Sequence, residues 1–204
     1  MRHHNPEKQE LISRSARTLF WRHGVRRVSV QEICREAGVS KMTFYKYYAN
    51  KTDLVRRILD DVFAAALEQY RLIMAQPVPF PQKVRETILL KAEQSRTLGP
   101  DFFDELFRDA DPAIRAHYTR LMERTMDEVM RDYLEAQKRE EIRSDIKPEF
   151  ILYILNRLID MIRDRELHRL YDSPSAVIME LTNFFFYGIL PRSNAAKGSS
   201  DAAA

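Results

Sequence analysis

Residues 29–54 read SVQEICREAGVSKMTFYKYYANKTDL, and this stretch decides the fold of the first part of the chain. Ser29 and Glu32 have the S-x-x-E spacing of a capping box, so a helix of about two turns is predicted to begin after Ser29. Ser40 is a second N-cap candidate, and it predicts a further short helix, Lys41 to Tyr48. Two short helices joined by a tight, glycine-containing turn are typical of a helix-turn-helix.

Helices are also predicted on both sides of this motif. Apolar residues recur at i, i+4 and i+8 over 5–23, and Gly24 suits the C-cap of that helix. Asn50 is the N-cap candidate of a long helix that ends near Ala75, just before a proline-rich connector. Further helices are predicted at about 82–97, 101–108, 112–139, 148–164 and 174–190.

The predicted fold class is therefore all-α, with about nine helices and no strand. A three-helix helix-turn-helix domain is expected at 1–51, and a larger helical domain at 52–191. Residues 192–204 are rich in Ala, Ser and Gly and lack periodicity, so they are expected to be a disordered tail. Only five glycines occur in the chain, which disfavours strand-and-turn folds and glycine-rich phosphate loops.

The charge of the chain is unevenly distributed. Residues 1–57 hold 13 Lys/Arg and 5 Asp/Glu, a net of +8, whereas residues 58–204 hold 20 and 25, a net of −5. The whole-chain value of +3 conceals this difference. A basic first quarter indicates a polyanionic partner.

Several classes of protein are disfavoured by the composition. No apolar stretch reaches the ~18–20 residues of a membrane-spanning helix, and no secretory signal is recognised, so no membrane partner and a cytoplasmic location are expected. The single cysteine, Cys34, is expected in the core of the second helix, and the five histidines show no metal-ligand spacing. Neither a metal, a cofactor nor a catalytic residue is predicted, and an enzyme is not expected.

The segment from Leu19 to Leu54 resembles the DNA-binding domain of the TetR family of bacterial transcriptional regulators. The matching features are the aliphatic-Phe end of the first helix, the capping box, the run Ala37–Lys41, Thr43, Tyr45 and the start of the fourth helix, Asn50-Lys51-x-Asp53-Leu54. The chain departs from the family pattern at Val28, where Thr is usual, and at Met42, where a small residue is common. Phe44 and Tyr48 replace the usual Leu and Phe, and these aromatic side chains are expected to keep the core apolar.

This resemblance implies contacts to double-stranded DNA. Gln31, Lys41, Met42 and Thr43 would approach the bases, while Tyr45, Tyr47 and Lys51 would hold the phosphate backbone. Lys46 is a further phosphate candidate from its charge alone. Each of these residues could instead be ordinary solvated surface, but three tyrosines and three lysines gathered in so short a segment favour binding.

The resemblance also implies an effector pocket and a dimeric helix bundle in the larger domain. The residues that would line the pocket are Phe102, Phe103, Phe107, Met122, Met126, Tyr133, Asn156 and Asp160, and any of them could instead be simple core. A mixed apolar and aromatic lining favours a lipophilic or aromatic effector, whose identity stays open. The residues expected at the homodimer interface are Ile151, Ile154, Leu155, Leu158, Ile162, Leu181, Phe184 and Phe185.

The sequence thus predicts a DNA-binding transcriptional regulator. The favoured form is a homodimeric repressor that binds a palindromic operator and is released by a small-molecule effector. A TetR-like activator, or a regulator that docks on another protein without a small ligand, fits the same residues. A helical enzyme is the remaining alternative and has no nucleophile arrangement or metal spacing to support it.

Overall fold

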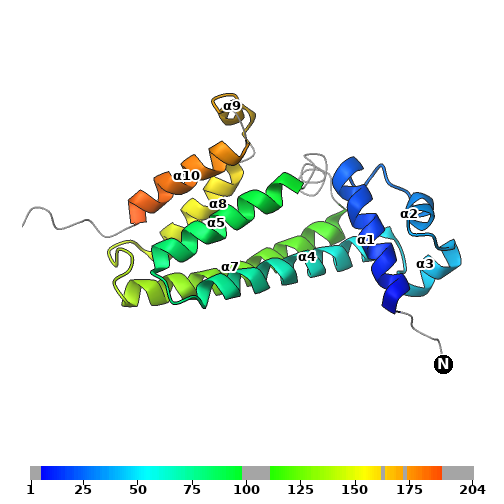
Figure 1. Ribbon diagram of the computed structural model, residues 1–204, viewed down its shortest axis with the longest axis horizontal. Coiled ribbons are helices and arrows are strands. Elements are labelled where there is room, and N and C mark those ends of the chain that lie inside the picture. The colour runs from blue at the N-terminus through cyan, green and yellow to red at the C-terminus, as the bar shows by residue number, and fades with distance from the viewer. Residues whose placement is uncertain (1–5, 98–110, 162–163, 172–173, 190–204) are drawn as a thin grey trace, which may run out of the picture. The chain divides into compact units, whose positions relative to one another are not determined.

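The computed structural model describes residues 6–97, 111–161, 164–171 and 174–189. Its helices are α1 (Pro6–His23), α2 (Val30–Glu36), α3 (Lys41–Tyr47), α4 (Lys51–Met74), α5 (Phe80–Thr97), α7 (Pro112–Lys138), α8 (Pro148–Met161), α9 (Arg165–His168) and α10 (Pro174–Ile189) (Figure 1). No strand occurs in these described ranges, and the all-α class is confirmed. The helix expected at 101–108 lies outside them, and the four-residue α9 was not predicted.

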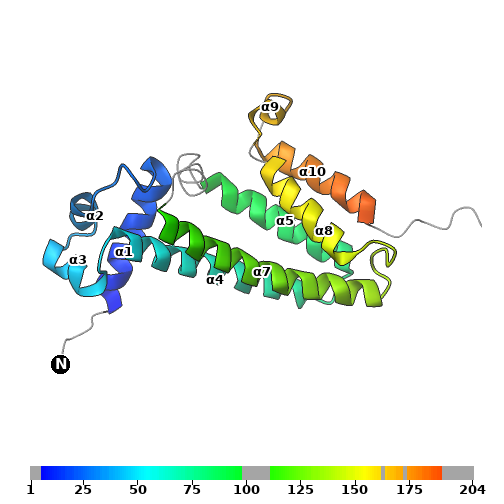
Figure 2. The same ribbon diagram turned by 180° about the vertical axis from the view of Figure 1, so that it is seen from behind.

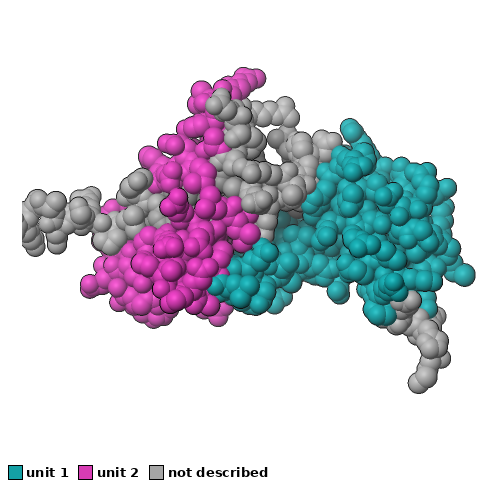
Figure 3. Space-filling view, in the orientation of Figure 1, with its two compact units in different colours: residues 1–72, 93–125 teal, residues 73–92, 126–204 magenta. Residues whose placement is uncertain are grey.

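The chain divides into two compact units (Figure 3). Unit 1 comprises residues 1–72 and 93–125, and unit 2 comprises residues 73–92 and 126–204. This division differs from the expected boundary after residue 51, because much of α4 and the first half of α7 belong with the helix-turn-helix. The functional domains expected at 1–51 and 52–191 therefore stay a prediction. Their boundary does not coincide with the boundary between the two compact units.

Unit 1 is built around one apolar cluster. The helix periodicity explains its membership, since α1 contributes residues at i, i+4 and i+8 and α4 contributes adjacent pairs one turn apart. The buried members include Ile12, Ala16, Phe20, Ile33, Cys34, Phe44, Leu54, Val55, Ile58, Leu59 and Ile114. Burying each large side chain contributes about 1.5–3 kcal/mol. The core therefore holds the three short N-terminal helices against α4 and the start of α7.

Specific contacts attach α7 to α4 within unit 1, where the two helices lie side by side in both ribbon views (Figures 1 and 2). The Phe63 and Tyr118 rings meet edge to face, with centroids 5.6 Å apart. His117 Nε2 lies 2.7 Å from Asp60 Oδ1. At the start of α4, the Thr52 hydroxyl donates to Asp111 Oδ2 over 3.2 Å. These contacts explain why unit 1 continues beyond the helix-turn-helix.

Unit 2 has a core of its own. Phe80 of α5 and Tyr133 of α7 pack edge to face, with centroids 5.0 Å apart. The amide of Gln137 donates to the carbonyls of Arg143 and Ile146, at 2.9 and 2.7 Å, and so fixes the connection between α7 and α8. Burial of the Tyr133 phenol raises its pKa well above its usual value. None of the described helices is long and apolar enough to cross a membrane.

Candidate nucleic-acid interface

The start of α2 is fixed by the predicted capping box. Ser29 has extended backbone angles, and its hydroxyl oxygen accepts a hydrogen bond from the backbone N–H of Glu32 over 3.2 Å. The Glu32 carboxylate accepts in return from the backbone N–H of Ser29 over 2.7 Å. These hydrogen bonds hold the pKa of the Glu32 carboxyl below its usual value. Two otherwise unpaired N–H groups are thus satisfied at the entry of the motif.

The turn between α2 and α3 depends on Gly38. This residue has a φ of +63°, which a residue with a side chain adopts only with strain. The N–H of Val39 donates to the carbonyl of Cys34 over 2.9 Å, and the N–H of Gly38 donates to that of Arg35 over 3.3 Å. Together these bonds form a Schellman motif. A Cβ on Gly38 would meet no atom within 4 Å, so backbone conformation alone requires glycine here.

Ser40 starts α3 as predicted. Its side-chain oxygen accepts from the backbone N–H of Thr43 over 3.1 Å, and the two hydroxyl oxygens lie 3.0 Å apart. Phe44 is completely buried beneath the helix and packs against the rings of Tyr45 and Tyr48. The buried phenylalanine therefore decides which face of this short helix points away from the core.

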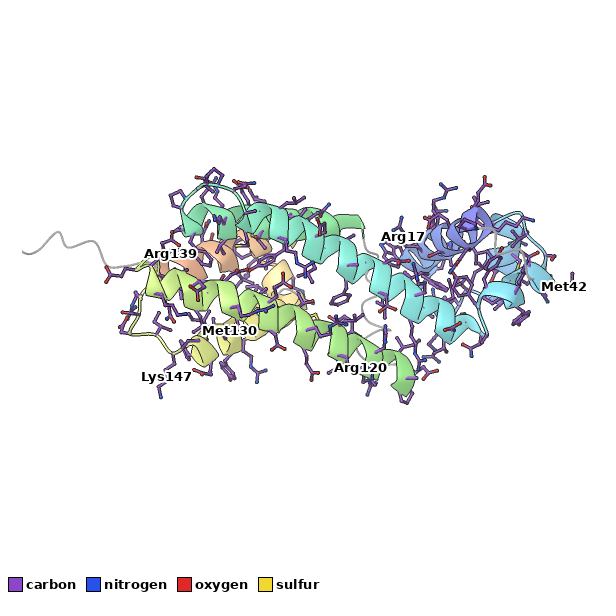
Figure 4. All side chains as sticks on the ribbon, turned by 90° about the horizontal axis from the view of Figure 1, so that it is seen from below. Arg17, Met42, Arg120, Met130, Arg139 and Lys147 are labelled. Carbon is purple, nitrogen blue, oxygen red and sulfur yellow. The ribbon has the colours of Figure 1, made fainter. Side chains whose placement is uncertain are left out.

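That outward face carries most of the residues predicted to contact DNA. Met42 is 84% exposed and points outward from α3 (Figure 4), and Tyr45 is 56% exposed. Gln31, Lys41 and Lys46 are also exposed, whereas Thr43 and Tyr47 are half-buried. The Lys46 ammonium lies 5.9 Å from the centre of the Tyr47 ring. The exposed side chains of the two neighbouring helices α2 and α3 thus include cationic, amide and aromatic groups.

Lys51 lies apart from this face and has a different environment. It is the first residue of α4, and its Nζ lies 2.8 Å from the carbonyl oxygen of Val25, 2.9 Å from that of Val28 and 3.4 Å from that of Arg26. All three carbonyls belong to the connection between α1 and α2. The family resemblance implied that this lysine contacts the DNA phosphate backbone. Nothing in the sequence indicated its contacts with the carbonyls.

Tyr48 contributes an unexpected buried hydroxyl. The residue is 3% exposed, and its oxygen has no hydrogen-bond partner of acceptable geometry among the described residues, although the Gln9 and Ser13 side chains face it. Burial raises the pKa of this phenol. The Tyr48 ring packs in the apolar core, as expected for a residue that replaces the usual Phe of the family. The burial of its hydroxyl group was not predicted.

The residues predicted for the effector pocket are only partly described. Phe102, Phe103 and Phe107 lie outside the described residues, as do the side chains of Asn156 and Asp160. Met122 is half-buried in unit 1; Met126 is half-buried and Tyr133 buried in unit 2. Among the described residues, no group of His, Cys, Asp or Glu could hold a metal ion. Cys34 is buried, and burial raises the pKa of its thiol, consistent with its predicted place in the core.

The predicted dimer-interface residues fall into different environments. Phe184 of α10 is 79% exposed, whereas Ile151 and Phe185 are core residues of their own chain and offer a partner almost no surface. Ile154, Leu158 and Leu181 are half-buried. Ile162 and the side chain of Leu155 lie outside the described residues.

Another face of α8 holds apolar surface that the sequence reasoning missed. Phe150 and Tyr153 are each more than half exposed, Met161 is exposed as well, and the Arg157 guanidinium lies 5.2 Å from the Tyr153 ring centre. These positions share the i, i+3, i+7, i+11 spacing of one helix face, displaced by one residue from the predicted set. Which face of α8 stays exposed depends on which face packs inside unit 2, and an apolar stripe in the sequence does not reveal this.

Comparisons with known proteins agree with this geometry. Residues 12–58 match the model of the bacterial regulatory proteins of the tetR family. An HTH-type transcriptional regulator of Bacillus subtilis (strain 168), YdgC, is 21% identical over 193 residues, which are 92% of this chain and 95% of the relative.

Solved structures of the same fold cover nearly the whole chain. The fatty acid degradation regulator FadR of Bacillus halodurans superposes with a TM-score of 0.74 at 15% identity, over 92% of this chain and 98% of that one. FadR of Bacillus subtilis, solved in complex with stearoyl-CoA, gives 0.72 at 14% identity, over 89% and 99%. Regulatory protein TetR of Rhodobacter sphaeroides gives 0.71 at 21% identity, over 89% and 98%.

Proposed function

Because the chain belongs to the TetR family of bacterial transcriptional regulators, we propose that it acts as a homodimeric repressor that binds a palindromic operator and is released by a small-molecule effector. The observation that carries this proposal is the outward face of α2 and α3. That face is held by two capped helix starts and a buried phenylalanine, and it presents Lys41, Met42, Tyr45 and Lys46 to solvent.

The residues of this face divide into two roles. Gln31 and Lys41 can donate hydrogen bonds to base edges in the major groove, and Met42 can contact a thymine methyl group. Thr43, whose hydroxyl is already near Ser40, would contribute its methyl group or share its hydroxyl. Tyr45, Lys46 and Tyr47 would hold phosphates and fix the register of the helix on the duplex.

A second copy of the chain is the partner proposed for unit 2. The exposed side chains of Phe150, Tyr153 and Phe184 on α8 and α10 provide apolar and aromatic surface of the kind enriched at interface centres. Pairing the same surface of two copies produces a two-fold axis, and two recognition helices related by that axis match a palindromic site.

A lipophilic compound is the effector proposed for unit 2. Tyr133 is buried and packs against Phe80, and the half-buried Met126 lies two turns earlier on the same side of α7, so aromatic and apolar side chains gather here. The Bacillus subtilis FadR structure contains stearoyl-CoA, so long-chain acyl-CoA is the first class of compound to test here. Release requires the effector to bind the DNA-free conformer more tightly, commonly by about 1–3 kcal/mol, a factor of about 5–150.

The test begins with duplexes selected from a random DNA pool by the purified protein. The proposal predicts a palindromic consensus, binding of two chains per site by light scattering, and at least about fivefold weaker binding by fluorescence anisotropy when the effector is present. Failure to enrich any sequence would contradict operator recognition.

The activator alternative predicts a different outcome from the same reagents. Transcription in vitro from a promoter carrying the selected site should fall on adding the protein if it is a repressor and rise if it is an activator. A regulator that docks on another protein would bind the site with the same affinity whether or not lipophilic compounds are added.

A further inference from the structure

The Lys51 side chain joins two elements that are distant in sequence. It extends from the first residue of α4 to the connection between α1 and α2, and its ammonium lies within 2.8, 2.9 and 3.4 Å of three backbone carbonyl oxygens there. An ammonium group has three N–H donors and no acceptor. Three carbonyl oxygens of one connection thus lie within hydrogen-bond distance of a single cation.

We propose that Lys51 is a positioning residue for DNA recognition, whose ammonium fixes the α1–α2 connection to the start of α4 and does not hold a phosphate. The inference rests on the proposed DNA-binding function and changes the role that the family resemblance implies for this lysine. Two of the three carbonyl contacts are partly buried, where backbone oxygens need partners, and a cation that binds several carbonyls at once fixes a connection that lies outside any helix.

The segment held by Lys51 leads directly into the recognition surface. Val28, whose carbonyl accepts one of the hydrogen bonds, is 3% exposed in the core, and the next residue is the N-cap of α2. On the other side, the N-terminus of α4 is fixed by Asn50, whose side-chain oxygen accepts from the N–H of Asp53 over 2.8 Å. Loss of the lysine contacts would loosen the start of α2 and, with it, the placement of Gln31.

The two possible roles of Lys51 predict different salt dependence. Each phosphate neutralised by a cationic side chain adds about −0.9 to the slope of log K against log salt concentration. A lysine that holds a phosphate contributes to this slope and acts on all DNA alike. A lysine that positions the recognition surface leaves the slope unchanged, and its loss weakens binding to the selected site more than binding to random DNA.

The experiment compares Lys51→Met with two matched variants in the full-length protein. Lys46→Met removes an exposed cation from α3, and Lys138→Met removes a cation from unit 2. Anisotropy titrations over a range of salt concentrations are made with a duplex selected by the wild type and with a random duplex. Thermal unfolding of each variant is followed by circular dichroism, so that affinities are compared only between folded proteins.

We expect Lys51→Met to weaken binding to the selected duplex by about tenfold or more, because it removes three hydrogen bonds and the loss of a single one to a charged group corresponds to about tenfold. Its salt slope should equal that of the wild type, and the ratio of specific to random affinity should fall. Lys46→Met should reduce the slope by about 1 with both duplexes, and Lys138→Met should change neither quantity.

A slope reduced by about 1 in Lys51→Met, with equal loss on both duplexes, would overturn the inference and leave the proposed function intact. Unchanged affinity for both duplexes would overturn it as well.

If Lys51→Met does not fold, Lys51→Arg distinguishes the two roles. Arginine binds phosphate well, but its planar guanidinium cannot replace a compact ammonium among three carbonyls. Wild-type affinity in Lys51→Arg would then contradict the positioning role. Absence of DNA binding by the wild type would instead refute the proposed function.

Discussion

The aromatic side chains of unit 1 and unit 2 differ in how far they are exposed to solvent. In unit 1, Phe20 and Phe44 are completely buried, and the exposed Tyr45 is followed directly by the cationic Lys46. In unit 2, Phe150 and Tyr153 of α8 and Phe184 of α10 are more than half exposed. Apolar exposure of this kind indicates a binding surface. Phe20 and Phe44 of unit 1 thus lie in its core, whereas the exposed aromatic side chains of α8 and α10 form the surface that we propose meets a second copy.

The largest expected effect comes from opening the core of unit 1. Phe44→Ala removes a completely buried ring and leaves a cavity, which should lower the free energy of unfolding by about 3–5 kcal/mol and abolish DNA binding. Urea denaturation followed by circular dichroism measures the change. Met42→Ala, at an exposed position of the same helix, is the control and should change stability by less than about 0.5 kcal/mol. Equal effects of the two substitutions would contradict the packing of α3.

The next effect tests the exposed aromatic surface of unit 2. Phe184→Asp places a charge on that surface and should raise the dissociation constant of the proposed dimer by about 30-fold or more, or about 2 kcal/mol. Analytical ultracentrifugation measures this constant. Leu72→Asp, at another exposed apolar position, should leave it unchanged. An unaffected dimer in the Phe184 variant would place the interface elsewhere.

A smaller effect of opposite sign is expected at Tyr48. Its buried hydroxyl lacks a partner of acceptable geometry among the described residues, so Tyr48→Phe removes a desolvated polar group without leaving a cavity. The variant should be more stable than the wild type by about 1 kcal/mol in urea denaturation. A loss of stability would mean that the hydroxyl has a good partner in solution.

The smallest effect concerns the capping box and appears as a pH dependence. The pKa of Glu32 is lowered in the folded chain, so the stabilisation is present above the ordinary value of 4.5 and is lost as the pH falls through the folded value. Glu32→Gln should therefore be less stable than the wild type at neutral pH and approach it in acid. Urea midpoints measured at several pH values test this, and a pH-independent difference would exclude ionisation of Glu32 as the cause.

The local structure of the helix-turn-helix could be predicted because its determinants are local. The cap at Ser29, the left-handed glycine at position 38 and the cap at Ser40 each act within a few residues, and each was found where the sequence places it. The buried face of α3 followed from the same short segment, since only Phe44 of its central residues points into the core.

The remaining features depend on contacts between distant segments. The carbonyl partners of Lys51 lie 23 to 26 residues away in sequence, and no spacing rule connects them. The exposed face of α8 lies one residue away from most of the positions predicted for the interface, for a related reason. The sequence of an apolar stripe does not reveal whether the stripe packs inside its own chain or against another copy. Ile151 was therefore predicted to lie at the dimer interface, although it is buried within unit 2.

The most direct test of the central claim is a salt titration of DNA binding by the unmodified protein. If basic and aromatic side chains of α2 and α3 hold a duplex in two copies, log K should fall linearly with log salt concentration. Between 50 and 200 mM salt, four or more phosphate contacts predict a loss of affinity of about 100-fold or more. An affinity that hardly changes over this range would contradict a DNA-binding function for this surface.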